Sequence, residues 1–115
     1  MREIAEAFPE YAEWVDEICG RMIDLLKPFR DFSYYHPQQI GSASLKHVLP
    51  VLTDLSYDGM EIGEGTMASL KFMEAAFDNI SDQERQKIRT DLLTYCGQDT
   101  GGMIEIVNKL QEMVS

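Results

Sequence analysis

An apolar stripe in the last third of the chain constrains the fold more than any other sequence feature. Residues recur there at steps of three and four, the period of one face of an α-helix. The stripe consists of Ile88, Leu92, Tyr95, Asp99, Met103, Ile106, Leu110 and Met113. Just before it, Ser81-Asp82-Gln83-Glu84 has the pattern of a capping box, which marks a helix start. The sequence therefore predicts a long helix to about residue 96 and, after a glycine-containing joint, a second helical stretch to Met113.

The remaining sequence predicts shorter helices joined by loops. Ile4–Met22 reads as an amphipathic helix that starts properly near Pro9, because proline is favoured in a first turn. Residues 21–26 are a short apolar run that fits either a strand or a helical turn. Ser42 or Ser44 would cap a short helix that Pro50 ends. Residues 31–42 and 53–65 read as loops, and a further helix is expected over 66–77, burying Met67, Leu70, Phe72, Met73 and Phe77. We expect a mainly α fold with at most one or two short strands, in one domain over residues 1–115.

Composition narrows the function. Apolar residues make up 44% of the 115, too many for a disordered chain. No run approaches the roughly 18 apolar residues of a membrane helix, so no membrane association is expected. Two distant cysteines indicate reduced thiols and a cytoplasmic protein. The net charge of −10 argues against a freestanding nucleic-acid binder. The densest basic cluster, Arg85, Lys87 and Arg89, alternates with acids and is typical of a solvated helix face.

Asp99 is the one carboxylate on the apolar stripe, and it needs a physical reason. An ionised carboxylate on a core-facing stripe is unfavourable unless it is paired, hydrogen-bonded or bound to a metal. In one interpretation, Gly97, Gly101 and Gly102 break the helix, and Asp99 is a solvent-facing N-cap. In the other, Asp99 faces a cleft and binds a metal, with Tyr95 one turn earlier on the same side.

Several segments extend this second interpretation. Leu92–Thr100, together with Met103, Ile106, Val107 and Leu110, resembles the third motif of RNase H-like DEDD exonucleases of the tyrosine subclass. Met22–Leu26 and Gly41–Pro50 together resemble the central region of these exonucleases, a strand followed by a Ser-Leu-Lys helix. More closely, three segments together resemble a bacterial family of domains of unknown function, family 2779, which is thought to have such a nuclease fold: Tyr34–Pro37, Gly41–Lys46 and Tyr95–Thr100.

The resemblance implies a chemistry and also a gap. In the exonucleases, four acids hold two divalent metals that activate water for attack on a phosphodiester. The resemblance makes Asp99 a metal ligand and catalytic residue, and Tyr95 the residue that orients the water. Mg²⁺ or Mn²⁺ would be the cofactor and nucleic acid the substrate of the complete domain. The first acidic motif of the exonucleases, an Asp-x-Glu pair on an early strand, would lie upstream of Met1, and so would the second. We therefore expect the C-terminal part of a larger RNase H-like α/β domain, from a truncated gene or a cut fragment, with neither tight metal binding nor catalysis on its own.

Other candidate residues have simpler interpretations. His36 and His47 lack partners at a metal-ligand spacing and are read as surface or packing residues. Asp24 is expected to cap or pair locally, or else to stand near the cleft of the complete domain. A cluster of four aromatic residues would pack in the core or, less frequently in such proteins, stack on the bases of single-stranded nucleic acid. These four are Phe29, Phe32, Tyr34 and Tyr35.

Three functions remain open from the sequence. The first is half of a nuclease-type domain whose other half is elsewhere. The second is a non-enzymatic acidic helical interaction module that forms a homodimer through an uncovered apolar face; its seven methionines make adaptable contacts. The third and weakest is an acidic mimic of nucleic acid that binds a basic partner.

Overall fold

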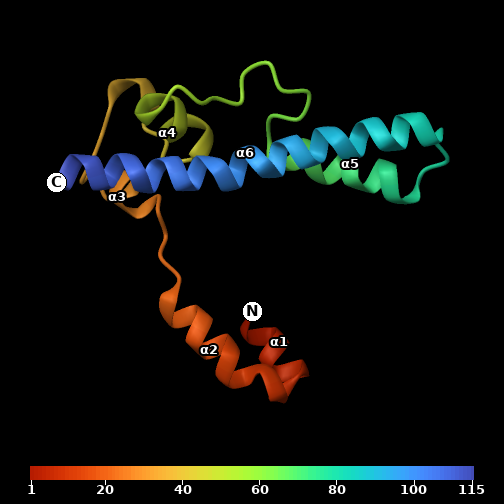
Figure 1. The fold of residues 1–115 in the computed structure, drawn as a ribbon, viewed down its shortest axis with the longest axis horizontal. Coiled ribbons are helices and arrows are strands. Elements are labelled where there is room, and N and C mark those ends of the chain that lie inside the picture. Colours follow the sequence, from red (N-terminus) through yellow and green to blue (C-terminus); the bar gives the residue numbers. More distant parts are fainter.

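Every regular element of the protein is a helix. The computed structural model describes residues 1–115 (Figure 1). The elements in chain order are α1 (Arg2–Ala7), η1 (Pro9–Tyr11), α2 (Ala12–Arg21), α3 (Lys27–Arg30), η2 (Pro37–Gln39), α4 (Leu45–Leu52), α5 (Gly65–Phe77) and α6 (Asp82–Val114). The mainly α prediction is confirmed. No strand forms at residues 21–26, where α2 ends and a turn leads into α3. No helix combines the length and apolar character that a membrane span needs.

The elements α1, η1 and α2 form an N-terminal arm (residues 1–21) in which they contact one another. Figure 1 shows this arm standing apart from the other helices, at the end of an extended link. The predicted helix start near Pro9 is only partly right. The chain is already helical from Arg2, the proline opens the short turn η1, and α2 begins at Ala12. Val15 is the one buried residue of the arm, so most of its apolar face is in contact with solvent.

α6 is the longest helix, and both α4 and α5 pack on it. Its 33 residues span about 50 Å at the usual helical rise, close to the longest extent of the molecule, 51 Å. The predicted capping box is confirmed, because the Ser81 hydroxyl accepts from the Glu84 N–H at 3.2 Å and the Glu84 carboxylate accepts from the Ser81 N–H at 2.9 Å. The predicted glycine joint is wrong, since α6 runs unbroken through residues 97–102. Contacts with α4 and α5 support the helix against a glycine penalty of about 1 kcal/mol per residue.

The core lies where α4 and the segment around α3 pack on the C-terminal half of α6. Its buried members are Phe29, Val48, Leu49, Leu52, Tyr57 and Ile106. Gly102 allows the close approach of α4 to α6, because a Cβ there would lie 3.1 Å from a methyl carbon of Leu49. Ser44, one of the two predicted positions, is the N-cap residue of α4, although its side chain makes no capping hydrogen bond. The predicted end at Pro50 is wrong, since α4 continues to Leu52. The proline removes one helical hydrogen bond, and the buried side chains on either side of it keep the last turn in place.

α5 packs against the N-terminal half of α6 as the other arm of a helical hairpin (Figure 1). The prediction that its apolar residues are buried is wrong, since all five are exposed: Met67, Leu70, Phe72, Met73 and Phe77. One neighbouring helix covers only one side of α5, whereas its apolar residues are distributed around the helix. The radius of gyration, 17.7 Å, exceeds the roughly 13 Å of a compact domain of this length, which reflects the protruding arm and hairpin.

Candidate functional site

Asp99 lies in the middle of α6, and a tyrosine from a distant loop holds its carboxylate. The Tyr57 hydroxyl donates to Asp99 Oδ1 at 2.5 Å. Tyr57 lies in the loop between α4 and α5. Gln98, the residue just before Asp99 on α6, anchors that loop by donating from Nε2 to the Ser56 carbonyl at 3.0 Å. The N-cap interpretation of Asp99 is therefore wrong. Its carboxylate is half-buried and hydrogen-bonded within the fold.

Tyr95 completes this cluster one helical turn before Asp99. The ring centroids of Tyr57 and Tyr95 are 6.0 Å apart, and the two ring planes are inclined by 53°. Burial and the nearby Asp99 charge raise the pKa of Tyr95 above its usual value. Burial, followed by the hydrogen bond to Asp99, raises the pKa of Tyr57 more strongly. Both phenols therefore remain protonated at neutral pH, and the Tyr57 proton serves Asp99. We call these three residues the Tyr-Asp cluster.

The stripe that predicted this face is confirmed for most of its length. Ile88 and Ile106 are buried, and four further members are partly buried: Leu92, Tyr95, Asp99 and Leu110. The stripe thus placed Tyr95 and Asp99 on the inner face together. It could not find Tyr57, because the hydrogen bond spans 42 residues of sequence and no periodicity links the two positions.

The residues of the chain do not fit a divalent-metal centre by themselves. No three His, Cys, Asp or Glu side chains gather anywhere in the fold. Asp99 is the only carboxylate of the Tyr-Asp cluster, and one of its oxygens already accepts from Tyr57. Magnesium needs near-octahedral oxygen coordination, and a two-metal centre needs several carboxylates. Any metal bound at Asp99 would therefore need ligands from another polypeptide segment.

The remaining polar candidates have local partners. Asp24 accepts from the Leu26 N–H and from the Arg30 guanidinium, each at 3.0 Å, which lowers the pKa of Asp24 and confirms the expected local pairing. His36 caps η2 by accepting from the Gln38 N–H at 3.3 Å. His47 Nδ1 lies 2.8 Å from the Ser44 hydroxyl. Each of these contacts accounts for its side chain within the local structure.

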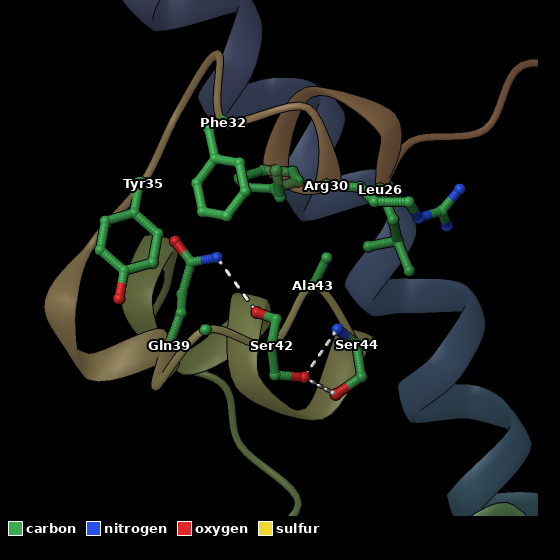
Figure 2. A pocket seen from close by; sticks show the side chains of 10 residues that line it. Leu26, Arg30, Phe32, Tyr35, Gln39, Ser42, Ala43 and Ser44 are labelled. Carbon is green, nitrogen blue, oxygen red and sulfur yellow. Dashed lines mark hydrogen bonds between the residues drawn. The ribbon is translucent and has the colours of Figure 1, made fainter.

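The four aromatic residues divide between core and surface. Phe29 is only 2% exposed, and its ring packs edge-on against Tyr34. Phe32 is 69% exposed and Tyr35 47% exposed. These two line an open cavity of about 390 Å³, which we call the aromatic pocket (Figure 2). Its other lining residues are Leu26, Phe29, Arg30, Gln39, Gly41, Ser42, Ala43 and Ser44. The core-packing interpretation is right for Phe29 and wrong for Phe32.

Comparison with known proteins gives one match. Residues 1–44 match the family described as Domain of unknown function (DUF2779). The matched segment contains the N-terminal arm, α3, η2 and every lining residue of the aromatic pocket, while the Tyr-Asp cluster lies outside it. No curated protein and no solved structure shows a significant match. The match supports the family resemblance over the first part of the chain and carries no activity with it.

Proposed function

We propose that this chain is the C-terminal part of a metal-dependent 3′–5′ exonuclease-like domain and is inactive alone. The observation that carries this proposal is the Tyr-Asp cluster: a carboxylate kept on the inner face of the longest helix, with a tyrosine one turn earlier. Placing a carboxylate there is unfavourable for folding unless it is used or compensated. The hydrogen bond from Tyr57 compensates for part of that penalty and also fixes the direction of the carboxylate.

In the complete domain, Asp99 would be one ligand of a Mg²⁺ or Mn²⁺ centre whose other carboxylates come from a different segment. Divalent metals in such centres activate water and stabilise the leaving oxygen of a phosphodiester. The roles of this chain's own residues are narrower. Asp99 would present its second carboxylate oxygen to the centre, because Oδ1 accepts from Tyr57. Tyr95 would offer a protonated hydroxyl for hydrogen bonding to water or substrate, in keeping with its raised pKa.

The test supplies the missing carboxylates in trans. The polypeptide encoded immediately upstream would be co-expressed with this chain, and degradation of a 3′-labelled strand would be followed with Mn²⁺. We expect activity that Asp99→Asn abolishes and Tyr95→Phe lowers. Asp91→Asn is the matched control, because this carboxylate lies two turns earlier on α6 and pairs with Lys87 at 2.8 Å. Upstream DNA without an Asp-x-Glu strand, or activity indifferent to Asp99, would refute the proposal.

A second function is supported by a different observation, the uncovered apolar side chains of the arm and of α5. Eight large ones are more than half exposed on these elements: Ile4, Phe8, Tyr11, Trp14, Leu70, Phe72, Met73 and Phe77. Large exposed apolar patches mark interaction sites. As an acidic helical interaction module, the chain would form a metal-independent homodimer. Light scattering after size-exclusion chromatography in EDTA tests this, and a monomer at all concentrations would exclude it.

A further inference from the structure

The aromatic pocket combines two solvent-exposed rings with polar groups on its floor. Figure 2 shows Phe32 and Tyr35 along one side of the cavity with Ser42 and Ser44 opposite, and the Arg30 guanidinium beyond Leu26, pointing away from the rings. The two rings are 5.7 Å apart and tilted by 50°. Rings held at the mouth of an open cavity present apolar faces to whatever enters it. Flat π-systems are the ligands that such faces recognise.

The backbone holds Phe32 in its exposed position despite strain. Its φ angle is +56°, in the left-handed region that non-glycine residues rarely adopt. Ile40 at +55° and Gly41 at +73° turn the chain in the same way beneath the cavity. Gln39, only 1% exposed, fixes this loop by accepting from the His36 N–H at 2.8 Å and donating to the Ser42 carbonyl at 3.2 Å. The pocket is therefore preorganised, and the exposed ring is a fixed feature of the loop.

The polar groups suit a ligand with an anionic backbone and a hydrogen-bonding edge. Arg30 reaches Asp24 with one guanidinium nitrogen at 3.0 Å, which leaves further N–H donors of the fork for another acceptor. The Ser42 hydroxyl donates to the Ser44 hydroxyl at 3.2 Å, and the Ser44 hydroxyl lies 2.8 Å from His47 Nδ1. They can accept from or donate to the edge of a base, as serine does with either kind of partner.

The charge around the pocket departs from that of the whole chain. Residues 24–52 contain three basic and two acidic side chains, a net charge of +1, together with both histidines. The full chain carries −10. The acids that argue against nucleic-acid binding are thus concentrated elsewhere. Arg30 is paired with Asp24 at 3.0 Å, as Lys87 of the basic cluster on α6 is paired with Asp91 at 2.8 Å.

We propose that the aromatic pocket binds an unstacked base of single-stranded nucleic acid, with the base stacked on Phe32, its edge toward the serine hydroxyls and a phosphate at Arg30. The proposal deepens the proposed function, because a nuclease-like domain must hold a strand, and it names where this chain does so. Aromatic platforms combined with a basic group are the usual means of holding single strands, with little sequence preference. The cavity volume lies within the range of small-ligand sites.

The experiment measures binding without catalysis. Fluorescence anisotropy of labelled single strands of about 12 nucleotides, DNA and RNA, is recorded at low salt in EDTA. Phe32→Ala should weaken binding about tenfold, since one stacked base contributes that order of affinity. Ile104→Ala is the control, because this side chain is 58% exposed on α6 and lies outside both the pocket and the exposed apolar side chains of the arm and α5; it should leave binding unchanged. Circular dichroism confirms that both variants remain folded.

Two further arms identify the ligand. Arg30→Gln should reduce the salt dependence of binding by about one phosphate contact, whereas Arg21→Gln, which also removes an exposed ion-paired arginine, should not. Strands containing 5-bromouracil should crosslink to the 31–44 segment under ultraviolet light. Displacement by free nucleoside monophosphate at equal nucleotide concentration would assign the pocket to a free nucleotide and overturn strand binding.

Three results would overturn the pocket itself: no binding by the wild-type chain, equal binding of a duplex, or equal loss in the Phe32 and Ile104 variants. Because these measurements exclude divalent metals, they are independent of Asp99. A chain that binds strands but gives no Asp99-dependent activity in trans would refute the nuclease proposal alone. If the complex is active but Phe32→Ala leaves its affinity for single strands unchanged, the pocket proposal alone is refuted.

Discussion

Glycine-to-alanine substitutions in α6 test whether this helix is continuous and how it meets α4. An alanine Cβ at Gly97 or Gly101 would meet nothing within 4 Å, whereas at Gly102 it would lie 3.1 and 3.2 Å from the two methyl carbons of Leu49. Alanine is about 0.8–1.0 kcal/mol more favourable than glycine in a helix interior. The Gly97→Ala/Gly101→Ala double variant should therefore gain about 1.5–2 kcal/mol, which corresponds to a rise in melting temperature on the order of 5–10 °C.

The third glycine should behave differently. The same helical gain applies at Gly102, but Leu49 is fully buried and its methyl groups must give way. Overpacking of a core commonly destabilises by about 1–3 kcal/mol, so Gly102→Ala should be neutral or destabilising by up to about 2 kcal/mol. Urea unfolding followed by circular dichroism measures the stability of both variants. Destabilisation in the double variant would show that α6 is broken at its glycines, and a full gain at Gly102 would show that α4 does not approach there.

Three further outcomes follow from single contacts. Ser81→Ala removes the capping hydroxyl of α6 and should cost about 1 kcal/mol in urea unfolding, with no loss expected for Ser69→Ala on the exposed face of α5. Leu49→Ala should cost about 2–5 kcal/mol, and a smaller loss would mean that the core around α4 is loosely packed. In the folded state the pKa of Tyr57 lies above the unfolded value of about 10, so the folded protein keeps the Tyr57 proton to a higher pH than the unfolded chain does. Stability should hold below pH 10 and fall as the pH rises above it, less steeply in Tyr57→Phe; identical alkaline profiles would contradict this.

Local rules predicted those parts of the fold that local interactions determine. The capping box needs only Ser81 and Glu84, three residues apart, and it forms as predicted. Asp24 finds its partners within six residues, so a local pairing was also within reach. The glycine joint failed because propensity is a small term: three glycines weaken a helix by about 1 kcal/mol each, and packing against α4 and α5 outweighs that.

The candidate site depends on contacts that the sequence pattern does not contain. Periodicity placed Tyr95 and Asp99 on one face, which is half of the Tyr-Asp cluster. The donor to Asp99 comes from a loop 42 residues away, and its position depends on the packing of α4 on α6 and on the Gln98 anchor. The aromatic pocket is similar, because the exposure of Phe32 follows from a left-handed backbone conformation that the composition of the loop did not reveal.

The N-terminal arm shows what an apolar period does and does not determine. The apolar residues of Ile4–Met22 were predicted to lie on one helix face, and this segment does form helices. Only Val15 is fully buried there, because the arm packs on nothing but itself. The helical spacing of apolar residues indicates which face of a helix is apolar, whereas burial of that face requires a second surface to pack against it. The other large apolar side chains of the arm and of α5 together exceed what this chain's own core can cover. Both functional proposals therefore require a further surface, either another segment of a larger domain or a second copy. Quenching of Trp14 fluorescence distinguishes them. Protection of Trp14 in the chain's own dimer would identify a second copy as the covering surface, and protection only with the other segment present would identify that segment.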